Sequence, residues 1–563
     1  MKLSGAKILL ESLKKEGVNI VFGYPGGAIL PTFDELYKEK DIRVYLVRHE
    51  QNAAFAADGY ARVTGHPGTA IVTSGPGATN TVTGIASAYM DSIPIVVISG
   101  QVSTSMIGSD AFQEVDTTGI TRPITKWNRI VKRVEDLAWT VKAAYYIANS
   151  GRPGPVVIDL PKDVQVMETE FNYPDQVDIK SYKPQYKGHP IQIKKAVEVI
   201  KRSKRPIIYC GGGVITSNAS KELVELAEKL NAPVTTTLMA LGAIDSKHPL
   251  NLGMLGMHGS VATNYAVSNC DVLIAIGARF DDRVTGKVET FAPNAVKIHI
   301  DIDPSSISKN VVVDVPIVGD VKEVLKDLIP LVDRLDTEDW LRQISEWQRE
   351  HPLRYNSSES VIKPQYLVEV LSDMTYGNAI VTADVGQHLM WVAQYYKFKY
   401  PRTWLCSGGL GAMGYAFPAG IGAKVAKPDA EVIAVVGDGA FQMSLQDLAS
   451  VSEYNLAVKI IIMNNFYLGM VRQWQELFYG KRYSSVFLGL SENQYLPDLV
   501  KLADAYNIKG LRVEKPSELK SAISTMLQHK GPFLLDVWVE KEENVLPMVP
   551  AGRGLMEMIE AMA

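Results

Sequence analysis

Short runs of apolar, mostly β-branched residues alternate along the whole chain with longer stretches that have helical spacing. Runs that are apolar throughout, rather than at every second position, are typical of strands buried on both faces of a parallel sheet. The pattern therefore predicts an α/β fold with helices on both faces of each sheet. The runs lie at 44–47, 69–72, 93–98, 156–158, 206–209, 272–276, 296–300, 379–382, 432–436 and 459–463.

Two polar segments without periodicity divide this series. The first runs from about residue 168 to 190 and the second from about residue 351 to 363. We interpret both as linkers. The chain is therefore expected to form three doubly wound parallel-sheet domains, each of a common domain size. Their expected bounds are 1–170, 188–345 and 363–563.

The composition is that of an ordinary globular protein. Of the 563 residues, 46% are hydrophobic and 21% charged, and the net charge of -4 comes without a basic block, which argues against nucleic-acid binding. The apolar runs are too short to span a bilayer, and Glu11 interrupts the N-terminal apolar stretch too early for a secretory signal. Cys210, Cys270 and Cys406 form no CxxC pair and are expected to be buried thiols. We therefore expect a cytoplasmic protein with no membrane span.

Polar groups follow two neighbouring apolar runs in the last third of the chain. The run 432–436 leads into Gly437-Asp438-Gly439, a helical segment follows from about 444 to 454, and the next run ends in Asn464-Asn465. Open α/β sheets bind ligands at such strand carboxyl ends. The Asp438 carboxylate and the Asn465 amide oxygen suit Mg²⁺, which commonly bridges to phosphates. Gly-Asp-Gly alone more often marks a turn, and the paired asparagine is what favours a site for a metal and a diphosphate.

A second signal lies in the first third. The run 44–47 leads into Arg48-His49-Glu50, and Gln51-Asn52-Ala53-Ala54 opens a helix. Taken alone, Glu50 would be a helix-start carboxylate facing water. The wider pattern, ending at Arg62, and the turn Gly75-Pro-Gly-Ala-Thr-Asn80 resemble the N-terminal signature of thiamine-diphosphate enzymes, whose motif in the last third also begins with Gly-Asp-Gly and closes with Asn-Asn.

Further sequence motifs extend this resemblance over essentially the whole chain. They stand in the order found in the catalytic large subunits of acetohydroxyacid synthases (acetolactate synthases), a family of thiamine-diphosphate-dependent enzymes. The words are Gly23-Tyr-Pro-Gly-Gly-Ala-Ile29, Gly100-Gln-Val, Ala111-Phe-Gln-Glu114, Gly151-Arg-Pro-Gly-Pro155, Asp159-Leu-Pro-Lys-Asp163, Leu255-Gly-Met-His-Gly259, Gly277-Ala-Arg-Phe-Asp-Asp-Arg-Val-Thr-Gly286, Val385-Gly-Gln-His388, Gly408-Gly-Leu-Gly-Ala-Met-Gly-Tyr415, Gly469-Met-Val-Arg-Gln-Trp474 and Pro547-Met-Val-Pro550.

The resemblance implies a role for each matching residue of the thiamine site. Glu50 would activate the cofactor, Val385 would hold the aminopyrimidine through its backbone, and Met413 would wedge under the bent ring system. Asp438, Asn465 and the backbone carbonyl of Tyr467 would bind Mg²⁺, although relatives often carry acidic or Gln residues around that carbonyl. Gln387, His388, Gly439 and Asn465 would surround the diphosphate, Ala440 and Met470 would also bind thiamine diphosphate, and Gly27, Phe112, Gln113 and Lys162 would line the reaction centre.

Two residues would meet the second substrate. Arg283 can pair with the carboxylate of the acceptor keto acid, and Trp474 would shape the pocket for its side chain. Without the resemblance, Arg283 would be interpreted as a surface charge and Trp474 as core packing.

The middle third of the chain matches the part of the family that binds FAD. Cys210-Gly211-Gly212-Gly213 after a strand would by itself be only a turn. The motif from Arg279 to Arg283 is absent from the degradative acetolactate synthases, which lack the flavin. Its presence here therefore implies FAD. The matching flavin positions are Arg152, Gly211, Gly212, Gly213, Thr237, Leu238, Met239, Met257, His258, Arg279, Asp301 and Asp320.

The resemblance implies a complete reaction. Pyruvate is decarboxylated on thiamine diphosphate, and the hydroxyethyl unit is transferred to pyruvate or 2-ketobutyrate, giving acetolactate or acetohydroxybutyrate for branched-chain amino acid biosynthesis. In the family the activating glutamate and the diphosphate site usually lie on different subunits, which implies a homodimer or homotetramer. A small regulatory subunit would be a further partner. The rivals are a pyruvate oxidase, a catalytically dead nucleotide-binding paralogue and a structural scaffold, and the joint presence of Glu50, Asp438 and Asn465 argues against the last two.

Overall fold

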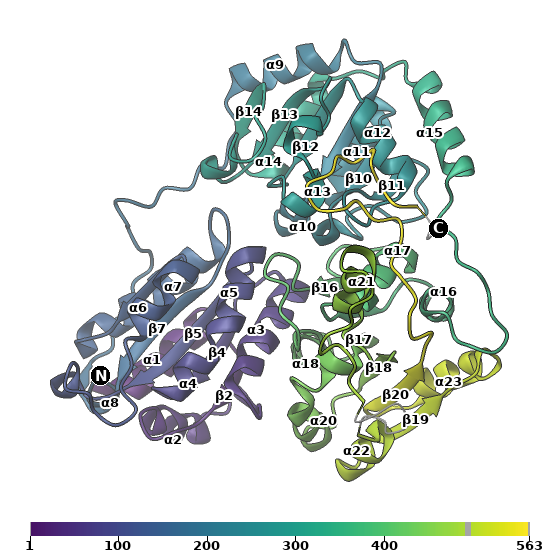
Figure 1. The fold of residues 1–563 in the computed structure, drawn as a ribbon. Coiled ribbons are helices and arrows are strands. Elements are labelled where there is room, and N and C mark those ends of the chain that lie inside the picture. Colours follow the sequence, from purple (N-terminus) through teal and green to yellow (C-terminus); the bar gives the residue numbers. More distant parts are fainter. Residues whose placement is uncertain (1, 490–496, 561–563) are drawn as a thin grey trace.

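The computed structural model describes residues 2–489 and 497–560 as three α/β units, each built on a six-stranded parallel sheet (Figure 1). The fold class predicted from the apolar runs is confirmed, because every run coincides with or overlaps a strand. Strands that the runs do not mark include the edge strands β6 (Trp127–Ile130) and β19 (Lys509–Val513), which are partly exposed and so lack a continuous apolar stretch.

The first unit has strand order β3-β2-β4-β5-β7-β6. Its strands are β2 (Ile20–Tyr24), β3 (Arg43–Leu46), β4 (Gly68–Val72), β5 (Ile95–Gln101), β6 and β7 (Val156–Pro161). Its helices are α1 (Gly5–Lys15), α2 (Leu30–Lys38), α3 (Glu50–Thr64), α4 (Pro76–Asn80), α5 (Val82–Asp91), α6 (Thr117–Thr121), α7 (Leu137–Asn149) and α8 (Lys162–Val166).

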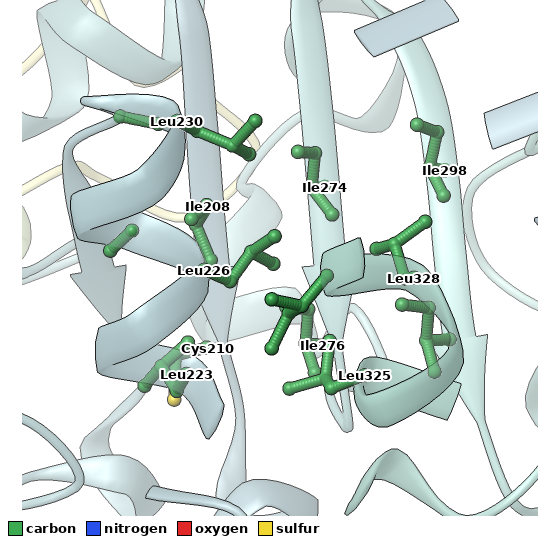
Figure 2. Packing of buried hydrophobic residues seen from close by; sticks show 14 of the residues in the cluster. Ile208, Cys210, Leu223, Leu226, Leu230, Ile274, Ile276, Ile298, Leu325 and Leu328 are labelled. Carbon is green, nitrogen blue, oxygen red and sulfur yellow. The ribbon is translucent and has the colours of Figure 1, made fainter. Parts of the chain in front are cut away.

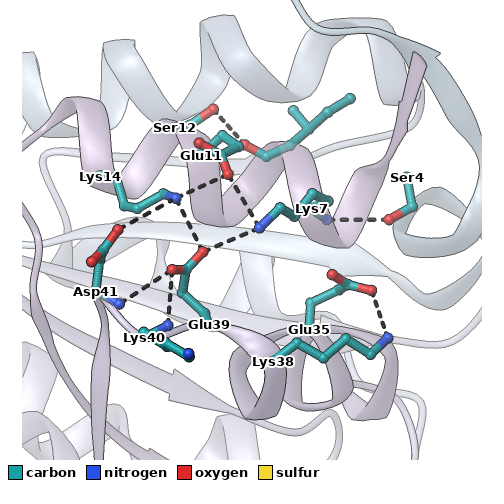
Figure 3. A network of polar contacts seen from close by, with 11 residues as sticks. Ser4, Lys7, Glu11, Ser12, Lys14, Glu35, Lys38, Glu39, Lys40 and Asp41 are labelled. Atoms are coloured by element: carbon teal, nitrogen blue, oxygen red, sulfur yellow. Dashed lines mark hydrogen bonds and ion pairs between the residues drawn. The ribbon is translucent and has the colours of Figure 1, made fainter. Parts of the chain in front are cut away.

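Polar contacts join the first two helices of this unit. Figure 3 shows Glu39, just after α2, accepting from Lys7 and Lys14 of α1 at 3.1 and 3.0 Å. Backbone N–H groups at Asp41 and Lys40, together with the two ammonium groups, lower the pKa of the Glu39 carboxyl to about 2. The expected linker from residue 168 begins differently than predicted, because β8 (Glu168–Glu170) pairs antiparallel with β1 (Lys2–Ser4).

The central unit has strand order β11-β10-β9-β12-β13-β14. Leucines of α11 (Ser220–Leu230) and α14 (Val321–Leu328) pack against isoleucines of three strands of this sheet, as Figure 2 shows. Its strands are β9 (Pro206–Cys210), β10 (Val234–Thr236), β11 (Asn251–Met254), β12 (Val272–Ile276), β13 (Val296–Asp301) and β14 (Val315–Val318). Its helices are α9 (Pro190–Ile200), α10 (Gly212–Thr216), α11 (Ser220–Leu230), α12 (Val261–Asn269), α13 (Asp282–Thr285), α14 (Val321–Leu328) and α15 (Glu338–Glu350).

The third unit has strand order β16-β15-β17-β18-β20-β19. Its strands are β15 (Ile380–Ala383), β16 (Trp404–Cys406), β17 (Val432–Gly437), β18 (Val458–Asn464), β19 and β20 (Phe533–Trp538). Its helices are α16 (Pro364–Thr375), α17 (Gln387–Tyr395), α18 (Ala416–Ala426), α19 (Asp438–Phe441), α20 (Leu448–Glu453), α21 (Gly469–Phe478), α22 (Leu499–Ala505) and α23 (Pro516–Gln528).

Two connections fix how the units meet. Helix α3 of the first unit lies along α18 of the third, and a would-be Cβ on Gly422 would overlap the backbone of Ala56. The C-terminal tail, yellow in Figure 1, leaves the third unit and crosses the central one, where the Val549 N–H donates to the Met257 carbonyl at 2.8 Å. Among the described residues, no helix is both long and apolar enough to cross a membrane.

Candidate active site and cofactor sites

The carboxyl edge of the third sheet gathers the residues predicted for the metal and the diphosphate. Val385, Gln387 and His388 follow β15, Asp438 to Ala440 follow β17, and Asn465 and Tyr467 follow β18. These strands are neighbours in the order β15-β17-β18 and run parallel, so their carboxyl ends lie together. The tertiary structure thus brings segments far apart in sequence to one place.

Asp438 places a buried carboxylate at this edge. The residue is 2% exposed, and its Oδ2 accepts no hydrogen bond from the described residues. Burial raises the pKa of this carboxyl to about 7. A buried carboxylate oxygen of this kind is a suitable ligand for a hard divalent cation, which would offset the cost of burying its charge.

The turn after β18 presents the other predicted metal ligands. Asn465 Oδ1 accepts from the Tyr467 N–H at 3.1 Å, and Asn465 Nδ2 donates to Gln387 Oε1 at 3.4 Å. Between them, Phe466 has a φ of 62°, a left-handed conformation that non-glycine residues seldom adopt. Such strain at a turn persists where the surroundings demand it, and here it shapes the backbone that carries the Tyr467 carbonyl.

His388 and two glycines form a close-fitting wall beside Asp438. The imidazole carbon Cε1 lies 2.9 Å from where a Cβ on Gly437 would be and 2.7 Å from a Cβ on Gly386, so a larger residue at either position would displace this ring. Burial lowers the pKa of His388 to about 3, which keeps the ring neutral. Its Nε2 has no hydrogen-bond partner among the described residues, which leaves a buried group able to donate to or accept from a ligand.

Asp384 is a residue of this site that the sequence interpretation missed. It is fully buried, and its carboxylate accepts from the backbone N–H groups of Val385, Gly414 and Ala416 at 2.8, 2.9 and 3.0 Å. These bonds hold the turn of Met413 beside Val385. The signal was present, because Asp384 is the polar residue directly after an apolar run.

The remaining predicted thiamine residues line the same edge. Met413 Cε lies 3.9 Å from a would-be Cβ on Gly439, while a Cβ on Gly469 would overlap Gln387 and Asn465. The Gln387 amide donates to Gln473 of α21 and to the Glu543 carbonyl, both at 2.8 Å. Ala440 is buried and Met470 half-buried beside these groups.

The carboxyl edge of the first sheet gathers the predicted catalytic residues. Glu50 begins α3 after β3, is 9% exposed, and accepts from Asn80 Nδ2 at 2.9 Å. Its other carboxylate oxygen lies 3.4 Å from a would-be Cβ on Gly77. The glycine-rich turn noted in the sequence is therefore the wall against which this carboxylate rests.

The other four predicted residues at that edge are half-buried or exposed. Gln113 has a φ of 61°, and its carbonyl lies 2.8 Å from a would-be Cβ on Gly75. The neighbouring residue, Phe112, is 87% exposed. Gly27, after β2, and Lys162, after β7, are also exposed. An apolar side chain this exposed is typical of an interaction surface.

Apart from Arg152 of the first unit, the predicted flavin residues lie at the carboxyl ends of the six central strands. Gly211 to Gly213 follow β9, Thr237 to Met239 follow β10, and Arg279 follows β12, with the others after β11, β13 and β14. A Cβ on Gly211 or Gly213 would clash with the backbone at Gly277, so these two glycines are required by packing alone. The buried Thr237 hydroxyl has no partner among the described residues, which fits a site for a polar ligand.

Several flavin candidates already have intramolecular partners. Asp320 caps α14 by accepting from the Lys322 and Glu323 N–H groups at 3.0 and 3.2 Å. Arg152 reaches across from the first unit to Asp303 at 3.1 Å. His258 is buried under the C-terminal tail, 3.2 Å from the Pro547 carbonyl, and Asp301 accepts from the Asp303 N–H at 2.8 Å.

The two predicted acceptor residues lie on exposed or half-exposed surfaces. The Arg283 side chain is 59% exposed and faces Asp282 at 3.7 Å. Trp474 is half-buried on α21, with its ring 5.4 Å from that of Phe478. The guanidinium of Arg283 is therefore accessible to a carboxylate, and Trp474 is not a core residue of this chain.

Comparison with known proteins gives a consistent result. Three models of the thiamine pyrophosphate enzyme family match: the N-terminal TPP binding domain at residues 3–120, the central domain at 193–328 and the C-terminal TPP binding domain at 384–537. The chain is 52% identical to the "Probable acetolactate synthase large subunit" of Methanocaldococcus jannaschii, over 99% of this chain and 95% of the relative. It is 48% identical to the "Acetolactate synthase isozyme 3 large subunit" of Escherichia coli (strain K12), over 99% of this chain and 98% of the relative.

Proposed function

This chain belongs to the acetolactate synthase large subunits of the thiamine pyrophosphate enzyme family. We propose that it removes CO₂ from pyruvate and transfers the remaining hydroxyethyl unit to a second 2-keto acid. With pyruvate as acceptor the product is acetolactate, and with 2-ketobutyrate it is acetohydroxybutyrate. The observation that carries the proposal is the pair of buried groups without partners among the described residues, Asp438 Oδ2 and His388 Nε2, at one sheet edge.

These residues fit a diphosphate held through a cation. Asp438, the Asn465 amide oxygen and the Tyr467 carbonyl would bind Mg²⁺, and the neutral His388 ring with Gln387 would contact the diphosphate oxygens. Glycines at 437 and 439 let the backbone approach closely. When bound, thiamine diphosphate supplies a carbon nucleophile and an electron sink for decarboxylation.

The chain's own groups move the proton and orient the substrates. The Glu50 carboxylate, held by Asn80, would exchange a proton with the aminopyrimidine ring. Gln113, Lys162, Gly27 and Phe112 would line the space in which the keto acids react. Arg283 would pair with the acceptor carboxylate, and Trp474 would contact its side chain.

The proposal includes FAD bound at the carboxyl edge of the central sheet. The buried, unpartnered Thr237 hydroxyl and the Gly212 position, whose Cβ would meet only Met239 at 3.2 and 3.7 Å, support a ligand there. The carboligation involves no net redox change, so we assign the flavin a structural role. A pyruvate oxidase would use the same flavin as electron acceptor and is the rival to be tested.

The proposed active form contains at least two copies of this chain. Glu50 has its partners Asn80 and Gly77 within its own unit, while Asp438 lies in the third unit. Exposed apolar side chains flank both edges, with Phe112 at the first and Leu410 and Met443 at the third. Covering such groups in a homodimer or homotetramer supports sites shared between subunits. We further propose a cytoplasmic location, in keeping with three buried free thiols, and a small regulatory partner like that implied by the relatives' names.

An assay for acetoin tests the proposed reaction. The purified chain receives pyruvate, Mg²⁺, thiamine diphosphate and FAD, and acid then converts acetolactate to acetoin, which is measured by its colour reaction. We expect acetoin that depends on added thiamine diphosphate. Bleaching of the flavin absorbance by pyruvate at the turnover rate, without acetoin, would instead identify a pyruvate oxidase.

A further inference from the structure

The segment 407–415 follows β16, carries Met413, and is held from another unit of the same chain. Asp91, the last residue of α5, accepts from the Gly409 N–H at 2.7 Å and from the Gly408 N–H at 3.1 Å. The Asp91 side chain is 1% exposed. In Figure 1 the loop before α18 extends toward α5 at the junction of the units.

Asp91 is one end of a buried charge network that also reaches the far end of the segment. Arg62 Nη2 donates to Asp91 Oδ2 at 2.8 Å, and Arg62 Nε donates to Asp58 Oδ1 at 2.6 Å. The Tyr415 hydroxyl donates to the same Asp58 oxygen at 2.6 Å. Two carboxylates on either side of one guanidinium therefore bind the segment at its start and at its end.

Further contacts leave the segment little freedom. The Ser407 hydroxyl pairs with the Ser87 hydroxyl of α5 at 2.8 Å. A Cβ on Gly409 would lie 2.9 Å from Asp91 Oδ1 and 3.0 Å from Arg279 Nη2, and a Cβ on Gly408 would collide with the Met239 sulfur. The segment thus passes between the first unit and two predicted flavin residues, and it is closely packed at both glycines.

We propose that Asp91 is a positioning residue for the thiamine cofactor, acting through the segment 407–415 to set the place of Met413. This inference rests on the proposed function, since it takes Met413 to contact the cofactor ring system. The geometry gives the reason: both Asp91 oxygens accept, one from each glycine N–H, and the Arg62 guanidinium compensates the buried charge. Asparagine cannot replace it, because its NH₂ group would face the donors of Gly408 or Gly409.

The test is a double-mutant cycle read out by cofactor binding rather than by turnover. Thiamine diphosphate is titrated with Mg²⁺ by calorimetry into wild type, Asp91→Asn, Met413→Ala and the double variant. We expect Asp91→Asn to weaken binding about tenfold or more, as for loss of a charge-assisted hydrogen bond. In the Met413→Ala background the same substitution should have a much smaller effect, because the route through Met413 is gone.

Controls separate this role from general destabilisation. Asp271→Asn removes a carboxylate that likewise accepts from two backbone N–H groups, those of Lys204 and Arg205 at 2.7 and 3.0 Å, and should leave thiamine binding unchanged. If Asp91→Asn does not fold, the cycle is run with Ser87→Ala, which releases the same segment more gently. Equal losses in both Met413 backgrounds would overturn the proposal. If the wild-type protein binds no thiamine diphosphate, the proposed function itself is wrong.

Discussion

The chemistry of each side chain at this site depends on whether the protein supplies its hydrogen-bond partners. Glu50 has a donor in Asn80 and rests against Gly77, so its carboxylate is oriented before any ligand arrives. Asp438 Oδ2 is buried without a partner among the described residues, and burial raises the pKa of that carboxyl to about 7. The first arrangement suits proton exchange, and the second suits a cation.

Replacing Glu50 with Gln should leave cofactor binding largely intact, because the amide keeps the shape of the side chain and an oxygen for the Asn80 N–H group. Turnover should fall by roughly 10²–10⁴-fold, the usual contribution of a proton-transferring group. The direct measurement is the rate at which the reactive carbon of the bound cofactor exchanges its proton for deuterium. Near-normal turnover in Glu50→Gln would remove Glu50 from the mechanism.

Replacing Asp438 with Ala should abolish the dependence of thiamine diphosphate binding on Mg²⁺, because the bridging cation would lose its carboxylate ligand. Calorimetric titration with and without Mg²⁺ measures this. Asp384→Ala is the comparison, since Asp384 accepts from three backbone N–H groups and should weaken cofactor binding while leaving the effect of Mg²⁺ in place. Tight binding by Asp438→Ala that Mg²⁺ still strengthens would locate the metal elsewhere.

Replacing Trp474 with Leu should change the choice of acceptor more than the total rate. 2-Ketobutyrate exceeds pyruvate by one methylene, which an apolar pocket discriminates by about 1–3 kcal/mol, roughly 10–200-fold. Supplying both keto acids and measuring the ratio of acetohydroxybutyrate to acetolactate tests this. Phe478→Leu is the matched control, because its ring lies 5.4 Å from Trp474 on the same helix but is more exposed. An unchanged ratio with activity retained would leave Trp474 as packing only.

At the scale of secondary-structure elements, the loops that follow the parallel strands position the predicted site residues. The loop after β5 that carries Phe112 and Gln113 is anchored by a buried pair: Gln101 Nε2 donates to Asp159 Oδ2 at 3.0 Å and to the Val115 carbonyl at 2.8 Å. Asp159 lies in β7 and is 1% exposed. Burial raises the pKa of its carboxyl to about 7. The position of the loop is therefore tied to a group that titrates near neutral pH.

This predicts a pH dependence of stability that Asp159→Asn removes. The carboxyl has a pKa of about 3.9 when unfolded, so the folded protein binds the proton more tightly. Its contribution to stability is complete below that value and is lost as the pH rises toward 7, by up to roughly 1.4 kcal/mol per pH unit. Thermal midpoints of wild type and Asp159→Asn, measured from pH 5 to 8, should diverge in favour of the variant until about pH 7. Parallel profiles would assign the dependence to another buried carboxyl, such as Asp384.

At the scale of the whole molecule, the arrangement of units decides which groups can meet. Within one chain, the start of α3 docks on the third unit: the Arg48 N–H donates to Asp447 at 2.8 Å, and the Asn52 amide bonds to the same carboxylate. At the carboxyl edge of the first sheet, Phe112 is 87% exposed and Gln113 is half-buried. We propose that a second chain covers this face and that the active site is shared between subunits.

Mixing two inactive variants tests the shared site. If Glu50 of one chain serves Asp438 of another, unfolding and refolding Glu50→Gln together with Asp438→Ala yields mixed dimers with one intact site. Random pairing of equal amounts should restore about one quarter of the wild-type sites. Each variant refolded alone is the control and should stay inactive. If both groups of a site came from one chain, no combination would regain activity.

The pattern of apolar runs was sufficient for the fold class, and the sequence words for the family, and both are confirmed. Parallel strands buried on both faces need continuous apolar stretches, so local composition reveals many of them. The apolar runs did not mark the half-exposed edge strands β6 and β19, because these strands need no such stretch. The roles of the individual site residues remain predictions.

By itself the sequence determined which chemical groups end the strands: Glu50, Asp438, Asn465 and the glycines beside them. Only the tertiary structure decided which of these groups lack a partner and which residues hold the others in place. Asp447 and Asp91 act across gaps of many residues, and no local pattern marks them. The reason is physical: burial sets both the pKa and the need for a partner, and burial depends on how distant segments pack rather than on neighbouring sequence.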